Sequence, residues 1–190
     1  RLYDLFARAP WLGSLIEPRS SGGDLIEEGF ADLEPVLSHV MTKTGSVELT
    51  EMAVAAHGLE KAAATLAMRF TLVATNVPYL GRGKQHELLK DHCEREYPHA
   101  KADLATCFLL RTIALCAHGG TTALVAPQNW WFIKTYTAFR KSILSDQSFC
   151  AVATLGEEAW QSFGDRGPVA ALTIMSNVRP LAEDSFVGLD

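Results

Sequence analysis

The chain has 190 residues, of which 48% are hydrophobic and 21% charged. This is the balance of a globular domain with a sizeable core, and it excludes an intrinsically disordered chain. No apolar run approaches the ~20 residues that cross a bilayer, and no secretion signal is visible, so we expect a cytoplasmic protein. The net charge of −5 argues against tight, autonomous binding to a polyanion.

The charges are unevenly distributed along the chain. Residues 1–60 hold four Lys or Arg against ten Asp or Glu, whereas residues 61–190 hold thirteen against twelve. A surface that touches nucleic acid is therefore expected in the second part, with help from elsewhere. Arg1 stands in the middle of a helical pattern without a start Met, so we expect a piece of a longer protein.

The cysteines show no CxxC pairing. This spacing favours buried, reduced thiols over a disulfide framework or a metal site, and we expect no metal. The cysteines are Cys93, Cys107, Cys116 and Cys150.

Residues 1–68 are expected to form a helical segment. A helix is predicted over about 33–41, with Pro35 tolerated in its first turn. A second is predicted over about 50–68, where an Ala-rich run favours helix.

From Arg69 the pattern changes to alternating strands and helices. Residues 70–75 form a short apolar run with β-branched side chains, which is typical of a buried strand. A polar helix is expected over about 84–97, and an apolar helix over about 102–117 that stops at Gly119-Gly120. The later expected elements are a strand over 121–126, a helix over 130–144, and strands over 149–154 and 169–175.

Strands and helices that alternate with short connections predict a parallel α/β sheet. Only about fourteen residues with little helical pattern separate the last two strands. The final strand is therefore expected to run antiparallel.

The motif Asn76-Val77-Pro78-Tyr79 follows the first expected strand, at the end where ligands bind in open parallel sheets. The Asn side-chain oxygen and the neighbouring Val77 carbonyl can each accept one N–H of an exocyclic amine. The Tyr ring can stack on the base that carries this amine, as enzymes that extrude a base from a duplex require. An ordinary strand-ending turn would show the same residue types, because Asn and Pro are common there.

Asn-Pro-Pro-Tyr after a strand marks amino-group methyltransferases that use S-adenosylmethionine. The chain resembles, more specifically, the large N6-adenine DNA methyltransferases of fused restriction–modification and BREX phage-exclusion systems. The segments that carry this resemblance are 79–85, Tyr97-Pro98, 101–104, 127–130, Phe139-Arg140 and 155–160.

The resemblance implies an α/β fold, namely the later part of a Rossmann-like S-adenosylmethionine-dependent methyltransferase sheet after an N-terminal helical segment. Residues 69–178 would be the catalytic part, and 179–190 a linker or truncated tail. The implied reaction moves a methyl group from S-adenosylmethionine to N6 of adenine in DNA, in restriction–modification or phage defence.

The resemblance also assigns site residues. The residues that would hold the amine and the base are Asn76, Val77, Pro78 and Tyr79. The residues expected to bind DNA are Trp160, as a second face of the base pocket, and Arg82 and Lys84 on phosphates, although solvated charge explains the two cations almost as well. The residues expected near the cofactor are Asp103 and Phe108.

Two departures from the family pattern bear on activity. Val77 stands where Pro is commoner; it keeps the carbonyl but adds an N–H, and we expect it to loosen the turn. The family's glycine-rich cofactor loop is not found in residues 1–68. We therefore expect this piece alone to bind S-adenosylmethionine poorly and to be inactive. Its expected partners are DNA and the parent protein's N-terminal cofactor-binding half and target-recognition domain.

Two other functions stay open at this point. A protein glutamine-amide methyltransferase uses the same kind of motif. A non-enzymatic fragment could instead serve as a scaffold or a DNA-recognition partner.

Overall fold

The computed structural model describes residues 2–21, 47–156 and 169–190. The chain divides into two compact units, Arg1–Met68 and Arg69–Asp190. No helix within these described ranges is both long enough and apolar enough to cross a membrane.

The first unit is helical. Its helices are α1 (Leu2–Phe6), α2 (Ala9–Leu12) and α5 (Val47–Ala67), with short 3-10 turns at Gly13–Leu15 and Pro18–Ser21. The helix expected from about residue 50 is thus confirmed as α5, which begins at Val47. The helix expected over 33–41 lies outside the described residues.

The second unit is built on a five-stranded sheet with the order β1-β2-β4-β3-β5. β1 runs parallel to β2, β4 runs antiparallel to both β2 and β3, and β5 runs parallel to β3. The α/β class and the antiparallel direction of the expected last strand are confirmed. The strands are β1 (Phe70–Asn76), β2 (Cys116–Pro127), β3 (Ser148–Leu155), β4 (Ala170–Ser176) and β5 (Val187–Leu189).

β5 falls within residues 179–190, the stretch expected as a linker or tail. It adds to the edge of the sheet through pairs such as Ala151 with Val187.

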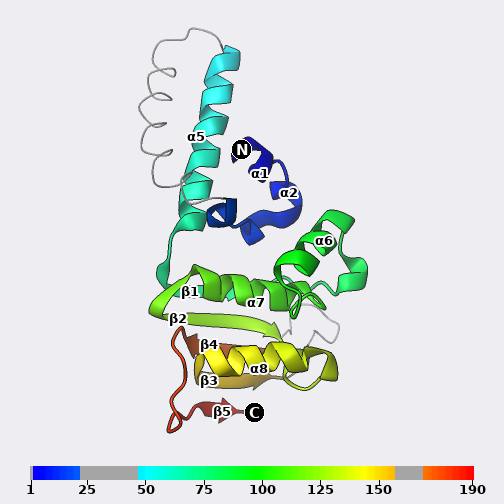
Figure 1. Cartoon of the computed structure of the whole chain (residues 1–190), viewed down its shortest axis with the longest axis vertical. Coiled ribbons are helices and arrows are strands. Elements are labelled where there is room, and N and C mark those ends of the chain that lie inside the picture. The colour runs from blue at the N-terminus through cyan, green and yellow to red at the C-terminus, as the bar shows by residue number, and fades with distance from the viewer. Residues whose placement is uncertain (1, 22–46, 157–168) are drawn as a thin grey trace. The chain divides into compact units, whose positions relative to one another are not determined.

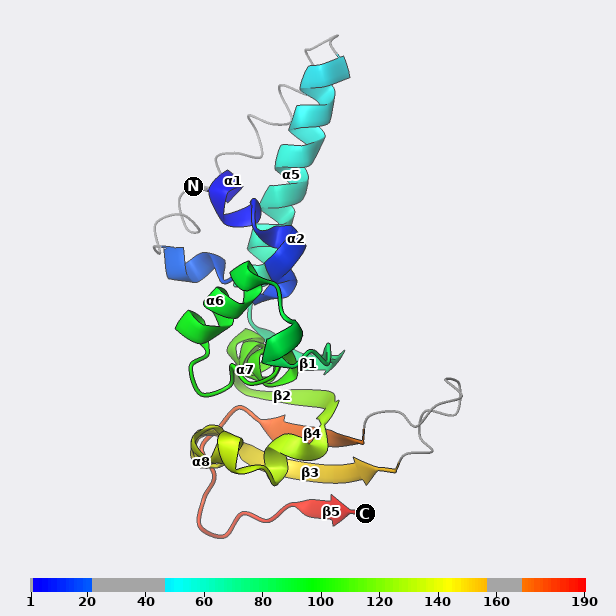
Figure 2. The same cartoon turned by 90° about the vertical axis from the view of Figure 1, so that its right-hand side faces the viewer.

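Three helices accompany this sheet: α6 (Glu87–Glu96), α7 (Leu104–Leu115) and α8 (Thr137–Asp146). α7 and α8 lie on the same face of the sheet in both views (Figures 1 and 2). The core of the unit includes fully buried side chains of these helices and of the central strands. They include Leu109, Phe139, Ile143, Thr122 and Met175.

Two helices begin later than the sequence predicts. Residues Arg82–Lys84 form a 3-10 turn, and α6 starts after His86, whose Nδ1 accepts the backbone N–H of Leu88 at 3.3 Å. The helix expected from residue 130 is broken into 3-10 turns at Gln128–Trp131 and Lys134–Tyr136 before α8.

β1 is not the buried strand that its apolar sequence predicts. It lies at one end of the strand order, and its Leu72 is 60% exposed. The register places Leu72 on the sheet face of the exposed Ile174, opposite α7 and α8. No described helix of this unit covers that face, so the apolar run indicates a strand without ensuring its burial.

The expected helix stop at Gly119-Gly120 is also wrong. α7 ends at Leu115 and β2 begins at once, so both glycines lie inside a strand. Gly119 has a φ of 74°, and the register between β1 and β2 shifts at this level. A Cβ on Gly120 would lie only 2.9 Å from the backbone oxygen of Thr71 in β1. The glycines therefore serve the close pairing of two strands.

Asn177, which directly follows β4, forms hydrogen bonds to this irregular part of β2 on the edge opposite β1. Its Nδ2 donates to the carbonyls of Cys116 and Ala117, at 3.0 and 3.2 Å. Its backbone N–H donates to Gly120 at 2.8 Å, and its carbonyl accepts the N–H of Gly119 at 3.1 Å.

The four cysteines are free thiols. Cys93, Cys107 and Cys116 are buried, as expected, whereas Cys150 is exposed. Within the described residues no group of side chains could hold a metal ion.

Candidate active site

The carboxyl ends of β1 and β2 lie side by side, because the register pairs Asn76 with Val125. The turn after β1 is the motif Asn76–Tyr79, and the turn after β2 is the 3-10 segment Gln128–Trp131. Ligands of open α/β sheets bind at this edge. The two turns therefore frame the candidate site.

The backbone of the motif is held tightly while its first side chain is left free for a ligand. Asn76 ends β1 with an exposed side chain. Val77 is only 3% exposed, and its N–H donates to the carbonyl of Val125 at 3.2 Å. The expectation that Val77 loosens the turn is therefore wrong, because its additional N–H extends the bonding between β1 and β2 by one step.

Tyr79 is half-buried, and its hydroxyl oxygen is the buried end of the side chain. The hydroxyl has no hydrogen-bond partner among the described residues. Burial raises the pKa of Tyr79 above its usual 10.0, so the hydroxyl stays protonated at neutral pH. A hydroxyl that stays neutral points to a role for the ring rather than for an ionised oxygen.

The loop after the motif is fastened to the start of α7 by backbone hydrogen bonds. The carbonyl of Leu80 accepts the N–H of Leu104 at 3.0 Å, and the N–H of Arg82 donates to Ala102 at 3.0 Å. The buried side chain of Gln85 adds a bond from its Nε2 to the Leu80 carbonyl, also at 3.0 Å. The motif is thus fixed on both sides, by β2 before it and by α7 after it.

Asp103 is the N-terminal cap of α7. Its Oδ1 accepts the N–H of Ala105 at 2.9 Å and, more weakly, that of Leu80 at 3.4 Å. One carboxylate oxygen therefore serves both the helix and the motif loop. The resemblance implies a place near the cofactor, and an Asp before a helical run is also a capping signal. Phe108, the other residue expected near the cofactor, is half-buried on α7.

Arg82 and Lys101 share one acidic partner. Arg82 Nη2 donates to Glu94 Oε2 at 2.7 Å, and Lys101 Nζ donates to Glu94 Oε1 at 2.5 Å. These two bonds lower the pKa of Glu94 to about 2. Arg82, which the sequence assigns to DNA phosphates, is therefore paired with an acid here, whereas Lys84 is exposed.

The turn after β2 is packed rather than open. Trp130 is 1% exposed, stacks on Trp131 at 4.1 Å and meets Phe139 edge-on at 5.4 Å. Arg140 Nη1 donates to the carbonyls of Trp130 and Ile133, at 2.6 and 2.7 Å. These residues form a scaffold beside the motif.

The structure thus brings Asn76–Tyr79, Arg82 and Asp103 together around one loop. Trp160 lies outside the described residues. β3, the strand before it, ends at Leu155, which pairs with Ala170 at the same sheet edge as the two turns.

Sequence reasoning missed three residues that hold this loop or its charges. The Val125 carbonyl gives no motif signal, and Gln85 stands in a segment that resembles the family without any role attached to it, because each acts through a contact that only the fold creates. In the sequence, Glu94 is one of many charges on a polar helix. Its two cationic partners are known only from the structure.

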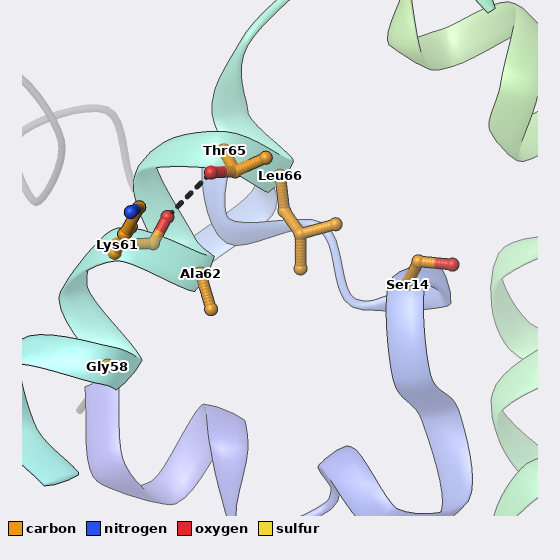
Figure 3. Close-up of a pocket in the computed structure, with 6 residues that line it drawn as sticks. All are labelled: Ser14, Gly58, Lys61, Ala62, Thr65 and Leu66. Atoms are coloured by element: carbon orange, nitrogen blue, oxygen red, sulfur yellow. Dashed lines mark hydrogen bonds between the residues drawn. The ribbon is translucent and has the colours of Figure 1, made fainter.

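A hollow lies in the first unit and contains none of the expected site residues. It has a volume of about 350 Å³ and lies between α5 and the turn at Ser14 (Figure 3). Thr65 at its rim donates to the Lys61 carbonyl at 2.8 Å. Most of the surface that its lining residues expose is apolar, which offers little for catalysis. The lining residues are Ser14, Gly58, Lys61, Ala62, Thr65 and Leu66.

Comparison with known proteins identifies relatives of the chain. Residues 27–160 match the Eco57I restriction-modification methylase family. The chain is 29% identical over 180 residues to the adenine-specific methyltransferase BrxX of Escherichia coli O9:H4 (strain HS), across 93% of this chain and 14% of that protein. It is 30% identical over 99 residues to the adenine-specific methyltransferase PglX of Lacticaseibacillus casei (strain Zhang), across 52% of this chain and 8% of that protein.

Among solved structures, the fold is similar to that in a DrdV–DNA complex. The TM-score is 0.51 at 19% identity, and the match covers 70% of this chain and 16% of that one. At this identity the likeness concerns the fold alone. The chain spans only 14% and 8% of the two curated relatives that it matches.

Proposed function

The chain belongs to the Eco57I restriction-modification methylase family, and we propose from this premise that it is the part of an adenine-specific DNA methyltransferase that grips the target base. The reaction would move a methyl group from S-adenosylmethionine to N6 of adenine in DNA. Its setting would be restriction–modification or phage defence. Because the chain spans 14% and 8% of its relatives, this activity is proposed for a protein of their length that contains the chain.

One observation carries the proposal. An exposed Asn76 side chain stands at the carboxyl end of a strand, on a backbone that the Val77–Val125 bond holds in place. A side-chain oxygen carried on a fixed backbone needs little reorganisation to accept a hydrogen bond in the transition state, which is the usual source of electrostatic catalysis.

In the proposed mechanism, Asn76 Oδ1 accepts one N–H of the adenine amine and the Val77 carbonyl accepts the other. These two bonds favour a tetrahedral nitrogen whose lone pair points out of the ring plane, toward the methyl donor. Transfer would release S-adenosylhomocysteine, and the methylated amine would then lose one proton to solvent. Pro78 limits the motion of the turn, and the ring of Tyr79 stacks on the base.

S-adenosylmethionine supplies an electrophilic methyl group when it is bound. Of the two residues expected near it, Phe108 fits an aromatic contact with a nucleoside, because its ring is half-buried on α7. Asp103 fits less well as a direct ligand, because its Oδ1 is engaged by two backbone N–H groups. We therefore assign Asp103 to positioning the motif loop.

Contacts to DNA complete the proposal. Lys84 is exposed two residues after Arg82, and both follow the motif closely. We assign both cations to phosphates beside the extruded base, and Trp160 to the second face of the base pocket. Stacking between two aromatic rings is a common way to hold a flipped base.

The test is single-turnover methylation by a protein of the relatives' length that contains this chain. Labelled S-adenosylmethionine is offered with an adenine-containing duplex and, separately, with a glutamine-containing peptide. We expect the label in N6-methyladenine, identified by mass spectrometry after digestion. Label in the peptide would favour a glutamine methyltransferase, and binding of DNA without any transfer would favour a non-enzymatic role.

A further inference from the structure

We propose that Glu94 is a built-in competitor for DNA: its carboxylate takes the place of a DNA phosphate on Arg82 and Lys101, and it is displaced when a phosphate binds. This inference rests on the proposed function, since it concerns the DNA that the site would bind.

The geometry of the three side chains is that of a bridged phosphate site. The backbone bond from Arg82 to Ala102 brings Arg82 beside Lys101, which comes from a different loop. Each oxygen of the Glu94 carboxylate then takes one cation, at 2.7 and 2.5 Å. Two non-bridging oxygens of a phosphodiester can make the same pair of charge-assisted bonds.

The pairing is open to exchange. The side chains of Arg82, Glu94 and Lys101 are 33%, 46% and 38% exposed. Ion pairs at such exposure contribute little free energy, so a competing anion can displace the carboxylate at a small cost.

Release has to come from competition rather than from protonation. The two cations hold the pKa of Glu94 at about 2, so its carboxylate stays charged throughout the neutral range. While Glu94 is in place, the two cations beside the motif are neutralised in part. DNA that makes few other contacts would then bind weakly, whereas a target that fills the base pocket could displace the carboxylate.

The chain offers a matched control for testing this. Glu96 lies on the same helix, is similarly exposed at 43%, and forms its own ion pair with Arg95 at 2.7 Å. Glu94→Gln and Glu96→Gln therefore remove the same charge from the same helix and free different cations. Both variants are made in a protein of the relatives' length that contains this chain, and binding of a fluorescent duplex is titrated by anisotropy at several salt concentrations.

Glu94→Gln is expected to tighten binding several-fold at low salt, because both freed cations can meet phosphates. It should also steepen the dependence of log Kobs on log salt by ~1 to 2, since each added phosphate contact contributes ~0.9. Glu96→Gln should change the slope by much less. Glu94→Asp keeps the charge but shortens the reach, so it should fall between the wild type and Glu94→Gln.

Two results would overturn the inference. Equal slopes for Glu94→Gln and Glu96→Gln would mean that only net charge matters. Weaker binding by a folded Glu94→Gln protein, checked by its circular dichroism melt, would mean that Glu94 positions the cations instead of competing for them. A wild-type protein that binds no duplex at any salt would contradict the proposed function itself, which is a different outcome.

Discussion

The two turns that end the parallel strands β1 and β2 are built in opposite ways. The turn after β2 is filled by Trp130, which packs on Trp131 and Phe139, while Arg140 binds its carbonyls. The turn after β1 leaves Asn76 exposed and is held through backbone bonds, foremost from Val77 to Val125.

This difference separates a scaffold from a site. Both turns carry an exposed asparagine, Asn76 in one and Asn129 in the other, so residue type alone does not distinguish them. What differs is how each turn is held. In the turn after β2, aromatic side chains are buried in packing contacts. In the turn after β1, backbone bonds to β2 and α7 fix the motif and leave its polar side chain for a ligand.

The largest expected effect lies in the scaffold turn. Trp130→Ala removes a side chain that is 1% exposed, and such truncations cost about 3–5 kcal/mol. Urea denaturation of this chain, followed by circular dichroism, measures the change. Asn76→Ala should shift the free energy of unfolding by less than about 0.5 kcal/mol, because its side chain is exposed. Similar losses for both would erase the distinction between the turns.

The next largest effect is on the rate of methylation. Here a substitution in the turn after β1 should cost more than one in the turn after β2, the reverse of the order expected for stability. Asn76→Ala is expected to slow methylation by ~10²-fold or more, because it removes an acceptor from the amine in the transition state. Asn129→Ala removes an equivalent amide from the scaffold turn and should cost less than about tenfold. Single-turnover methylation of a duplex gives both rates. A comparable loss for Asn129→Ala would assign chemistry to the second turn as well.

Tyr79 should depend on its ring more than on its hydroxyl. Tyr79→Ala removes a stacking face worth roughly 1–3 kcal/mol, and we expect Trp160→Ala to resemble it. Tyr79→Phe should be mild, because the hydroxyl lacks a partner among the described residues. The pH profile of Tyr79→Phe should match the wild type near neutrality, since burial raises the pKa of Tyr79 above 10.0. Severe and equal losses for Phe and Ala would mean that the hydroxyl takes part in the reaction.

The smallest effect is expected for Val77→Pro. It removes the N–H that bonds to Val125, at a cost of about 0.5–1.5 kcal/mol. A stiffer unfolded chain offsets about 0.4–1 kcal/mol of this cost. Stability should therefore change little. Methylation should stay within about tenfold, because the carbonyl remains and the fixed φ of the proline ring restrains the turn in place of the lost bond. A larger loss of rate with intact stability would show that the bond to Val125 positions Asn76.

The sequence predicts the order of the elements well, because a strand such as 70–76 and a helix such as 104–115 each appear as an apolar run of suitable length between polar or glycine- and proline-containing segments. It also places the motif correctly at the end of β1. The exposure of Leu72 is not predictable from its apolar side chain, since it depends on what covers that face of the sheet. The glycines at 119 and 120 predict a helix end that the structure does not have, because glycine both ends helices and permits close strand pairing.

The site was predictable where a role depends on residue type and local position, and less so where it depends on a contact. Asn76 and Tyr79 were found through their chemical groups. The resemblance assigns Asp103 to the cofactor, and the structure shows it as the N-terminal cap of α7. Glu94 pairs with residues twelve and seven positions away, a combination that only the folded loop brings together.

Gly120 has a consequence for how natural variation at this chain is interpreted. Since a Cβ there would lie 2.9 Å from the Thr71 oxygen, even alanine would push β1 away from β2. A survey of tolerated substitutions would then find position 120 as restricted as position 76, although Gly120 lies at the opposite end of the strand pair from the motif. Intolerance to substitution would reflect strand pairing at position 120 and the reaction at position 76. Measuring folding and turnover of the same variants would tell the two apart.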